Sequence, residues 1–325
     1  MKLGVLKSFC GEYMHYVRSC RDLGIEHEVV DIIAPDWMEK VERSGCDGYL
    51  CRPPSKVQER KTMFDERLTI LNRFMKREIY PSLDEMLIYE NKRMAHYWLK
   101  LQGFPHPETW VFYRKGDLRE FLKDFADYPL ISKTNIGAKS SGVRVLRSPG
   151  AVKGVGRMVF GIFRTPSMVT GYTPVRSGSV IRVPAYGLRE RHSLFLQRFE
   201  DIKWEWRMVR IGESYFGHRK LIGKKGLASG TRLKGWGAPP QELLELTREI
   251  CDRGGFHSMA IDILETADGR YLVNELQSIF GQSVDNLMYL DGVPGRYVED
   301  GDGFSFQRGG VQRPQQFHAQ GKALR

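Results

Sequence analysis

The sequence predicts a mixed α/β protein, in which a small parallel sheet of Rossmann-like order precedes a larger α+β region. Three features favour this fold class. Strand and helix patterns alternate over the first 80 residues, a Gly- and Ser-rich loop follows a short strand at residues 134–142, and an Asp-Gly turn joins two apolar strands near residue 268. With 325 residues, of which 41% are hydrophobic, the chain has room for two or three compact units.

The first region consists of alternating strand and helix patterns. Expected strands cover residues 2–7, 26–32 and 48–51, and expected helices cover residues 12–23, 37–43 and 56–79. This alternation favours a small parallel sheet with a Rossmann-like order. The glycine fingerprint GxGxxG is absent, so dinucleotide binding is not indicated.

The second region begins with a helix over residues 91–102, which Gly103 ends, and prolines then break the chain before the next strand. Met94, Tyr97, Trp98 and Leu101 form an apolar stripe on this helix, which we expect to face the core. The remaining expected elements are strands at residues 110–113, 129–133, 143–146, 194–199 and 207–211 and helices at residues 117–125 and 242–252. After Gly303 the chain becomes polar, and we expect roughly the last 20 residues to be loosely ordered.

The chain is basic, with a formal net charge of +11 and a pI near 9.4. Such a charge favours an anionic partner, for example a nucleotide or a phosphorylated or carboxylated substrate. Much of the charge lies between residues 203 and 234, where nine Lys and Arg residues stand against two acids, a local net charge of +7.

The cysteines and the N-terminus exclude several classes of protein. None of the five cysteines forms a CxxC pair, so neither a zinc site nor a disulfide framework is supported, and we expect buried, reduced thiols. The N-terminus has no secretory pattern, and no run approaches the roughly 20 apolar residues of a membrane span. We therefore expect a soluble cytoplasmic protein.

The most informative stretch comprises two apolar strands, at residues 260–264 and 271–277, that carry acids and an amide. The Asp-Gly turn between them predicts a hairpin, which brings Asp262 and Glu275 onto neighbouring antiparallel strands. Because side chains alternate along a strand, Glu275 and Gln277 share a face. Oxygen ligands that converge on one face suit a hard cation such as Mg²⁺, although solvated surface acids are the alternative interpretation.

A second candidate site is the loop at residues 134–142, which follows a strand ending in Lys133. Small residues allow backbone N–H groups to approach a phosphate, and Lys133 could reach the same phosphate. The P-loop pattern GxxxxGK[ST] is absent, so a Gly-Ser turn beside a solvated lysine remains an open alternative at this point.

The third candidate is the segment around Gln197 and Arg198, with Glu205 and Arg207 a few residues further on. A buried strand that ends in Gln and Arg could present its backbone to an adenine ring and use a nearby acid for the ribose. An exposed hairpin would have the same local sequence, so these residues alone leave both interpretations open.

The order of these segments resembles the ATP-grasp superfamily, and in particular ribosomal-protein glutamate ligases and glutathione-synthetase-like enzymes. The family opens a helix with Asn-Lys, here Asn91-Lys92, and continues with "L..G.P.P.T", here residues 101–109. A strand then ends in Lys before a glycine-rich loop, as at Lys133. The adenine hinge "QEF" of the family corresponds to Gln197-Arg198-Phe199. An acid-x-Arg pair follows, here Glu205-Trp206-Arg207. The last pattern is Asp, a hairpin and Glu-x-Asn, which corresponds to Asp262 with Glu275 and Gln277.

The resemblance implies that two β-rich subdomains clamp ATP. Their expected boundaries are residues 1–88 for a Rossmann-like pre-ATP-grasp domain, 89–195 for the small subdomain, 196–300 for the large subdomain and 301–325 for a polar tail. The implied ATP-binding residues are Lys92, Lys133, Ser140, Ser141, Gly142, Gln197, Arg198, Phe199 and Glu205. The implied catalytic residues are Arg207 and Arg219, and the implied ligands of one or two Mg²⁺ ions, or of Mn²⁺ in their place, are Asp262, Glu275 and Gln277. Three positions depart from the family pattern: Arg198 replaces Glu, Glu205 replaces Asp and Gln277 replaces Asn.

The implied function is an ATP-dependent, ADP-forming carboxylate–amine ligase that forms an acyl-phosphate on an anionic small-molecule, glycan or peptide substrate. The alternative on the same fold is a kinase that phosphorylates an anionic sugar or polyol. A third hypothesis, a basic protein that binds nucleic acid or polysaccharide, has less support because the basic residues lack a regular interleaving with aromatic residues.

Overall fold

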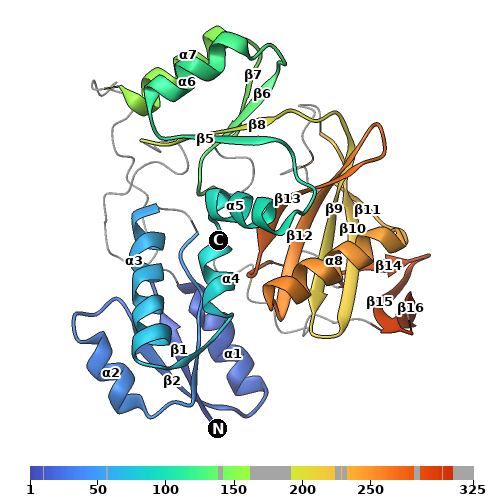
Figure 1. Ribbon diagram of the computed structural model, residues 1–325. Helices are drawn as coiled ribbons and strands as arrows, with labels where there is room; N and C mark the ends of the chain where they lie inside the picture. The colour runs from blue at the N-terminus through green and yellow to red at the C-terminus, as the bar shows by residue number, and fades with distance from the viewer. Residues whose placement is uncertain are drawn as a thin grey trace. The chain divides into compact units, whose positions relative to one another are not determined.

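The computed structural model describes residues 1–9, 11–55, 58–137, 142–161, 192–223, 228, 233–281, 286–301 and 303–309. The chain forms two compact units (Figure 1). Unit 1 consists of Met1–Gly103 and Pro107–Glu200, and unit 2 consists of Phe104–His106 and Asp201–Arg325. The described strands form two four-stranded sheets in unit 1 and one eight-stranded sheet in unit 2.

The first sheet of unit 1 is parallel, with the strand order β2-β1-β3-β4. Its strands are β1 (Lys2–Lys7), β2 (Glu26–Asp31), β3 (Gly48–Leu50) and β4 (Glu78–Tyr80). The helices of this part are α1 (Met14–Asp22), which follows a short 3₁₀ turn at Gly11–Tyr13, then α2 (Trp37–Ser44) and α3 (Gln58–Thr69). Val5 and Leu6 on β1 are fully buried, as expected for an inner parallel strand covered by helices. The predicted small parallel sheet is therefore confirmed.

The helix predicted over residues 56–79 is wrong at its C-terminal end. After α3 the chain continues as a π-helical segment, Ile70–Phe74, and Glu78–Tyr80 then forms the edge strand β4 beside β3. A three-residue strand directly after a helical pattern gives almost no periodic signal. A better signal comes just afterwards, because Ser82 and Glu85 form a capping box that starts α4 (Leu83–Ile88).

The second sheet of unit 1 is antiparallel, with the strand order β5-β8-β6-β7. Its strands are β5 (Thr109–Phe112), β6 (Leu130–Lys133), β7 (Arg144–Leu146) and β8 (Leu194–Arg198), and its helices are α5 (Lys92–Gln102), α6 (Lys115–Asp124) and α7 (Pro149–Phe160). Leu130, Leu196 and Val152 are fully buried at the centre of one apolar cluster that joins this sheet to α6 and α7. Lys133 is the last residue of the inner strand β6.

The apolar stripe that was expected to bury one face of α5 is wrong. Met94 is 41% exposed, Tyr97 is 45% exposed and Leu101 is 82% exposed, whereas the buried face carries Ala95 and Leu99 with His96. The spacing of the large apolar residues therefore predicted as buried the face of α5 that is in fact exposed. Smaller residues pack inside, because the loop after β6 lies close against the start of this helix.

The sheet of unit 2 has the strand order β13-β12-β9-β10-β15-β14, with β11 paired to β10 and β16 paired to β15. Its strands are β9 (Ile202–Ile211), β10 (Ser214–Lys220), β11 (Lys234–Gly235), β12 (Ser258–Thr266), β13 (Tyr271–Gln277), β14 (Tyr289–Leu290), β15 (Val293–Asp300) and β16 (Gly303–Arg308). Helix α8 (Gln241–Gly254) packs along β9 and β12, as Figure 1 shows. Most residues of the central strands β10 and β12 are buried, whereas β9 carries both buried and partly exposed residues.

Part of the tail that was expected to be loosely ordered forms a strand. Residues Gly303–Arg308 form β16, which pairs with β15, although the sequence from 301 onward was expected to be loose. Phe304 packs edge-on against Tyr215 and Phe306 against Tyr297, so two alternating aromatic residues hold the strand. The remainder of the expected tail, residues 310–325, lies outside the described residues.

The four described cysteines, Cys20, Cys46, Cys51 and Cys251, are buried free thiols, as predicted. Burial raises the pKa of the Cys51 thiol, so it is a poor nucleophile and behaves as a core residue. Within the described part of the chain, no helix has both the length and the apolar character needed to cross a membrane.

Candidate functional site

The candidate site of unit 2 lies on one face of its sheet. The Asp-Gly turn places Gly269 at a φ of +89° between β12 and β13, and Asp262 pairs with Glu275 in the resulting hairpin. On the other side of β12, Asp262 pairs with Arg207 of β9. Because side chains alternate, these three residues and Gln277 point to the same face. The predicted hairpin and its shared face are therefore confirmed.

A β-bulge adds a third polar residue of β13 to this face. The pairing of β12 with β13 shifts between Asp262 and Ile263, so both Asn274 and Glu275 lie opposite Asp262. In a bulge, one strand carries an extra residue, and the alternation of side chains is locally broken. The Asn274 side chain consequently reaches the site, where its Nδ2 donates to Glu205 Oε2 at 3.0 Å.

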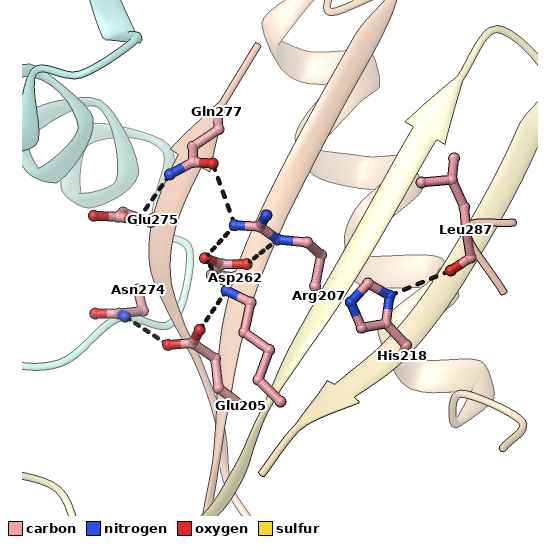
Figure 2. Close-up of polar contacts among 9 residues, drawn as sticks. Glu205, Arg207, His218, Asp262, Asn274, Glu275, Gln277 and Leu287 are labelled. Atoms are coloured by element: carbon pink, nitrogen blue, oxygen red, sulfur yellow. Dashed lines mark hydrogen bonds and ion pairs between the residues drawn. The ribbon is translucent and has the colours of Figure 1, made fainter. Parts of the chain in front are cut away.

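The centre of the site is a network of two carboxylates and two cations, which Figure 2 shows in close-up. Arg207 binds Asp262 with two parallel hydrogen bonds, Nε to Oδ1 and Nη2 to Oδ2, each of 2.8 Å. Lys220 donates to Asp262 Oδ2 and, at 2.6 Å, to Glu205 Oε1. Arg207 Nη2 also donates to Gln277 Oε1 at 3.2 Å, and Gln277 Nε2 donates to Glu275 Oε2 at 3.0 Å. The bidentate Arg207–Asp262 pair is the strongest and most directional of these contacts.

Burial and charge fix the protonation states of this network. Burial works against ionisation of Asp262, but the adjacent Arg207 and Lys220 outweigh it and hold the pKa of this carboxyl well below its usual range. Burial likewise opposes the charge of Lys220, while Asp262 and Glu205 raise its pKa above the ordinary value. The pKa of Glu205 is raised, chiefly by burial. Asp262 is therefore ionised at every ordinary pH, without competition from a proton.

Asp262, Glu275 and Gln277 fit a magnesium ion by the chemistry of their donor atoms, which are two carboxylates and an amide oxygen on one face. In the present arrangement Asp262 accepts hydrogen bonds from Arg207 and Lys220, and Gln277 accepts one from Arg207. Among the described residues, no group of three or more acidic, His or Cys side chains is already gathered as a metal site. A bound cation would therefore compete with Lys220 for Asp262.

Glu205, the residue expected to contact the ribose, is part of the buried ion network. Its side chain is only 3% exposed, and its two oxygens accept from Lys220 and Asn274. Glu205 and Arg207 are two residues apart on β9 and therefore lie on the same face. The ribose contact stays a prediction.

Arg219, expected to act with Arg207, lies on the opposite face of the sheet. It pairs with Trp206, whereas the adjacent Lys220 pairs with Glu205. Its guanidinium stacks over the rings of Trp204 and Trp206 at 4.9 and 5.6 Å, and its Nη2 donates to the Trp236 carbonyl. These contacts anchor the strands, and the structure does not bring Arg219 together with Arg207.

Four basic residues of the segment 203–234 pair with acids from outside it. Arg210 pairs with Asp252. Lys203 pairs with Glu265, and Arg207 and Lys220 share Asp262. Lys224, Lys225 and Arg232 lie outside the described residues. The local charge of +7 therefore overstates the positive field that these strands present.

The described residues expected to bind phosphate in unit 1 lie at the start of α5, at the end of β6 and at the end of the loop that follows β6. Lys92 is the first residue of this helix, and its Nζ donates to the Gly137 carbonyl at 3.0 Å. Lys133 ends β6, four residues before Gly137. Gly142 has a φ of +77°, and its carbonyl accepts from Thr134 N–H, which closes the base of the loop. Ser140 and Ser141 lie outside the described residues.

The expected adenine hinge lies at the end of β8. Gln197 is buried and uses its side-chain amide to bond Thr109 across to β5, so its side chain holds the sheet together. Arg198 ends β8 and pairs with Glu108 and Asp127, and its N–H donates to the Glu108 carbonyl. Phe199 follows immediately after the strand. The side chains of Gln197 and Arg198 therefore bond to residues in or beside the second sheet of unit 1.

His218 is a neutral member of the site that the sequence reasoning missed. It pairs with Arg207 across β9 and β10 and is 5% exposed. Its Nδ1–H donates to the Leu287 carbonyl at 3.2 Å, because a carbonyl can only accept. Burial, reinforced by Lys234 and Arg207, lowers the pKa of this imidazole to about 3.

We expect His218 to make unfolding pH-dependent. The folded pKa of about 3 is below the unfolded value of 6.5, so the unfolded chain binds the extra proton and stability falls as pH drops from 6.5 toward 3. At pH 5 the loss is about 2 kcal/mol relative to pH 8. Urea unfolding of the wild type and of His218→Asn, which keeps a donor for Leu287, should reveal this difference. Parallel stability–pH curves for the two proteins would contradict the assignment.

Lys220, like His218, was missed, yet the sequence holds a signal for both residues. Gly212, with a φ of +54°, and Glu213 form the two-residue turn between β9 and β10. Counting outward from that turn pairs Ser214 with Ile211, and therefore Lys220 with Glu205. The bulge that brings in Asn274 has no comparable signal.

Solved structures resemble this chain in fold. An N5-carboxyaminoimidazole ribonucleotide synthetase, solved as its ADP complex, is 13% identical with a TM-score of 0.60, over 87% of this chain and 71% of that one. D-cycloserine synthetase is 15% identical with a TM-score of 0.58, over 85% and 91% of the two chains. A RimK domain ATP-grasp protein from Sphaerobacter thermophilus is 18% identical with a TM-score of 0.54, over 85% and 90%.

At the level of sequence, no protein-family model matches the chain, and no curated protein matches it either. Similarity of structure at 13–18% identity establishes the fold. The chain has the ATP-grasp fold, which confirms the fold that the order of its motifs predicted.

Proposed function

We propose that the protein is an ATP-dependent, ADP-forming carboxylate–amine ligase. The observation that carries this proposal is the ion network of unit 2, in which Asp262 is ionised and held by Arg207 and Lys220 on rigid central strands of an ATP-grasp fold. The neighbours named as synthetases and ligases support the same reaction class.

In this proposal unit 1 supplies the cations for the nucleotide phosphates. Lys92 is the first residue of α5. Lys133 is the last residue of β6, directly before the loop that follows this strand. Each ammonium has three donors, so Lys92 can bind a phosphate oxygen while keeping its bond to Gly137. The backbone at Phe199 would face adenine, because the Gln197 and Arg198 side chains are engaged elsewhere.

Asp262, Glu275 and Gln277 would hold magnesium in unit 2, where the ion would neutralise phosphate charge. The low pKa of Asp262 supports this role, since a ligand must be deprotonated to bind a metal. Lys220, which bonds Asp262 and Glu205, would donate to the transferring phosphoryl group or to the acyl-phosphate. Arg207, with Nη1 outside its bonds to Asp262, would stabilise the same developing charge.

The chemistry needs positioning and charge neutralisation, and it needs no covalent nucleophile from the protein. A carboxylate oxygen attacks the γ-phosphorus of ATP, ADP leaves, and an amine then displaces phosphate from the acyl carbon. We infer a small anionic substrate, and one neighbour, from Aspergillus clavatus, was solved with ADP and 5-aminoimidazole ribonucleotide. The competing idea of a basic polyanion-binding protein is weakened, because acids already pair with Lys203, Arg207, Arg210 and Lys220.

The test is ADP release measured against a panel of acid–amine pairs, with hydroxylamine present as a trap. We expect ADP release that depends on a carboxylic acid, together with an acyl hydroxamate, because hydroxylamine intercepts an acyl-phosphate. ADP release with a polyol and without hydroxamate would assign the protein as a kinase. Strong nucleic-acid binding that weakens steeply with salt, without ADP release, would point to the basic-protein alternative.

A further inference from the structure

Gly137, at the beginning of the Gly-Ser loop, is held on both sides by side chains from one short segment. Its N–H donates to Glu90 Oε2 at 3.4 Å, and its carbonyl accepts from Lys92 Nζ at 3.0 Å. The N–H belongs to the peptide unit before Gly137, and the carbonyl belongs to the peptide unit after it. The two contacts together therefore fix both backbone dihedral angles of this residue.

Fixing a glycine matters more than fixing any other residue, because glycine has the widest range of backbone conformations to lose. In the wild type this freedom is already removed before a ligand arrives. Lys92, whose ammonium bonds the Gly137 carbonyl, can then meet a phosphate without this glycine first being ordered.

The segment that carries Glu90 is itself specially shaped. Glu90 has a φ of +50°, in the left-handed region that residues other than glycine seldom occupy, and it is 9% exposed. This conformation turns the chain between α4 and α5 so that the carboxylate of Glu90 and the ammonium of Lys92 both reach Gly137. Strained backbone of this kind persists where the surroundings enforce it, and it clusters at functional positions.

Asn135 provides a second anchor between the loop and the same segment. It is 1% exposed, its Oδ1 accepts from Arg93 N–H at 3.0 Å, and its carbonyl accepts from Lys92 N–H at 3.3 Å. Its Nδ2 donates to Gln58 at 2.9 Å. With Asn135 fixed in this way, Gly137 is the next point at which the loop needs support, and Glu90 supplies it.

We propose that Glu90 is a positioning residue for the nucleotide phosphates: its carboxylate holds Gly137 and thereby positions Lys92, which bonds the Gly137 carbonyl. This inference rests on the proposed ATP-binding function and adds a residue that touches neither nucleotide nor metal. Removal of the Glu90 oxygen frees Gly137, and the ordering must then occur at binding. We expect about tenfold weaker nucleotide binding, which is equivalent to about 1.4 kcal/mol.

The experiment is titration calorimetry of the full chain with MgADP as the probe. Glu90→Ala should raise the Kd about tenfold, while Glu90→Gln, which keeps an acceptor oxygen, should stay within about twofold of wild type. Glu90→Asp withdraws the carboxylate by one methylene and also tolerates the left-handed backbone, so it should fold and still bind MgADP more weakly. In turnover, KM for ATP should rise while kcat at saturating ATP stays within about threefold.

Glu85 offers a matched control, since it is also a buried carboxylate but caps α4 instead of holding the loop. Glu85→Ala should lower the Tm and leave the Kd for MgADP unchanged. Wild-type Kd values in both Glu90→Ala and Glu90→Asp would overturn the role of Glu90. A folded wild type that binds no MgADP would instead overturn the proposed function, so the two failures are distinguishable.

Discussion

Asp262→Asn is expected to abolish ADP release and to lower the free energy of unfolding by about 3–5 kcal/mol. The side chain is 4% exposed and carries the only described carboxylate that Arg207 pairs with. The neutral Asn leaves Arg207 without a countercharge. It also leaves Lys220, which is buried, with Glu205 as its remaining carboxylate partner among the described residues. The guanidinium loses its Coulombic attraction and one of its two hydrogen bonds to this side chain, because the amide nitrogen of Asn cannot accept. Denaturant unfolding and coupled ADP release on the same preparation measure both effects.

A compensating variant separates the loss of chemistry from the loss of stability. In the double variant Asp262→Leu with Arg207→Met, apolar side chains replace the buried pair, and such replacements commonly restore stability. We expect much of the unfolding free energy to return while ADP release stays absent. Recovery of turnover in this variant, or turnover near wild type in Asp262→Asn, would contradict the role of Asp262.

Glu275→Gln is expected to raise the Mg²⁺ concentration for half-maximal ADP release at least tenfold, with a change in unfolding free energy of about 1 kcal/mol or less. Glu275 is partly exposed and bonds Gln277 Nε2, so its replacement does not strand a buried cation. It does remove one of two charged oxygen ligands from the proposed site, and a hard cation binds an amide oxygen more weakly than a carboxylate. A magnesium titration of initial rates is the measurement.

Asp268→Asn is the matched control for that titration, because Asp268 lies in the turn of the same hairpin and pairs with exposed Arg270. It should titrate with magnesium like the wild type. Equal magnesium requirements for Glu275→Gln and Asp268→Asn would remove Glu275 from the metal site.

The hairpin was predictable from the sequence, for a local reason. An Asp-Gly turn sets the pairing of the strands beside it, and strand alternation then decides which residues share a face. These rules place Glu275 and Gln277 on one face, as the register shows, but the bulge between Asp262 and Ile263, which they do not foresee, sets Glu275 opposite Asp262. The same counting from the turn at Gly212 would have paired Lys220 with Glu205.

The partners of Asp262 could not be read from composition. A stretch with nine basic residues suggested an exposed positive surface, but the acids that neutralise it, such as Asp252 and Asp262, come from later in the chain. Only the order of strands in the sheet brings β9 and β10 beside β12. Asn274 enters through a bulge, which is a distortion that period-two reasoning excludes.

In unit 1 the sequence identified candidate residues, but it did not reveal which side chains are buried and which are exposed. Lys92 and Lys133 fall at the ends of elements, as the motif order implied. The stripe of Met94, Tyr97 and Leu101 nevertheless proved to be the exposed side of α5, because size and spacing do not say which face a neighbouring loop will cover. Glu90 carried no motif at all, and its role arises from a backbone turn that only the structure reveals.

The central claim is that a carboxylate oxygen attacks ATP, and isotope transfer tests it most directly. The acid of the most active acid–amine pair is labelled with ¹⁸O in its carboxylate, and the released phosphate is analysed by mass spectrometry. The account predicts that each phosphate formed in the first turnover carries one ¹⁸O atom, because the acyl-phosphate bridge oxygen leaves with phosphate when the amine attacks. Phosphate free of ¹⁸O, released at the same rate as ADP, would contradict it.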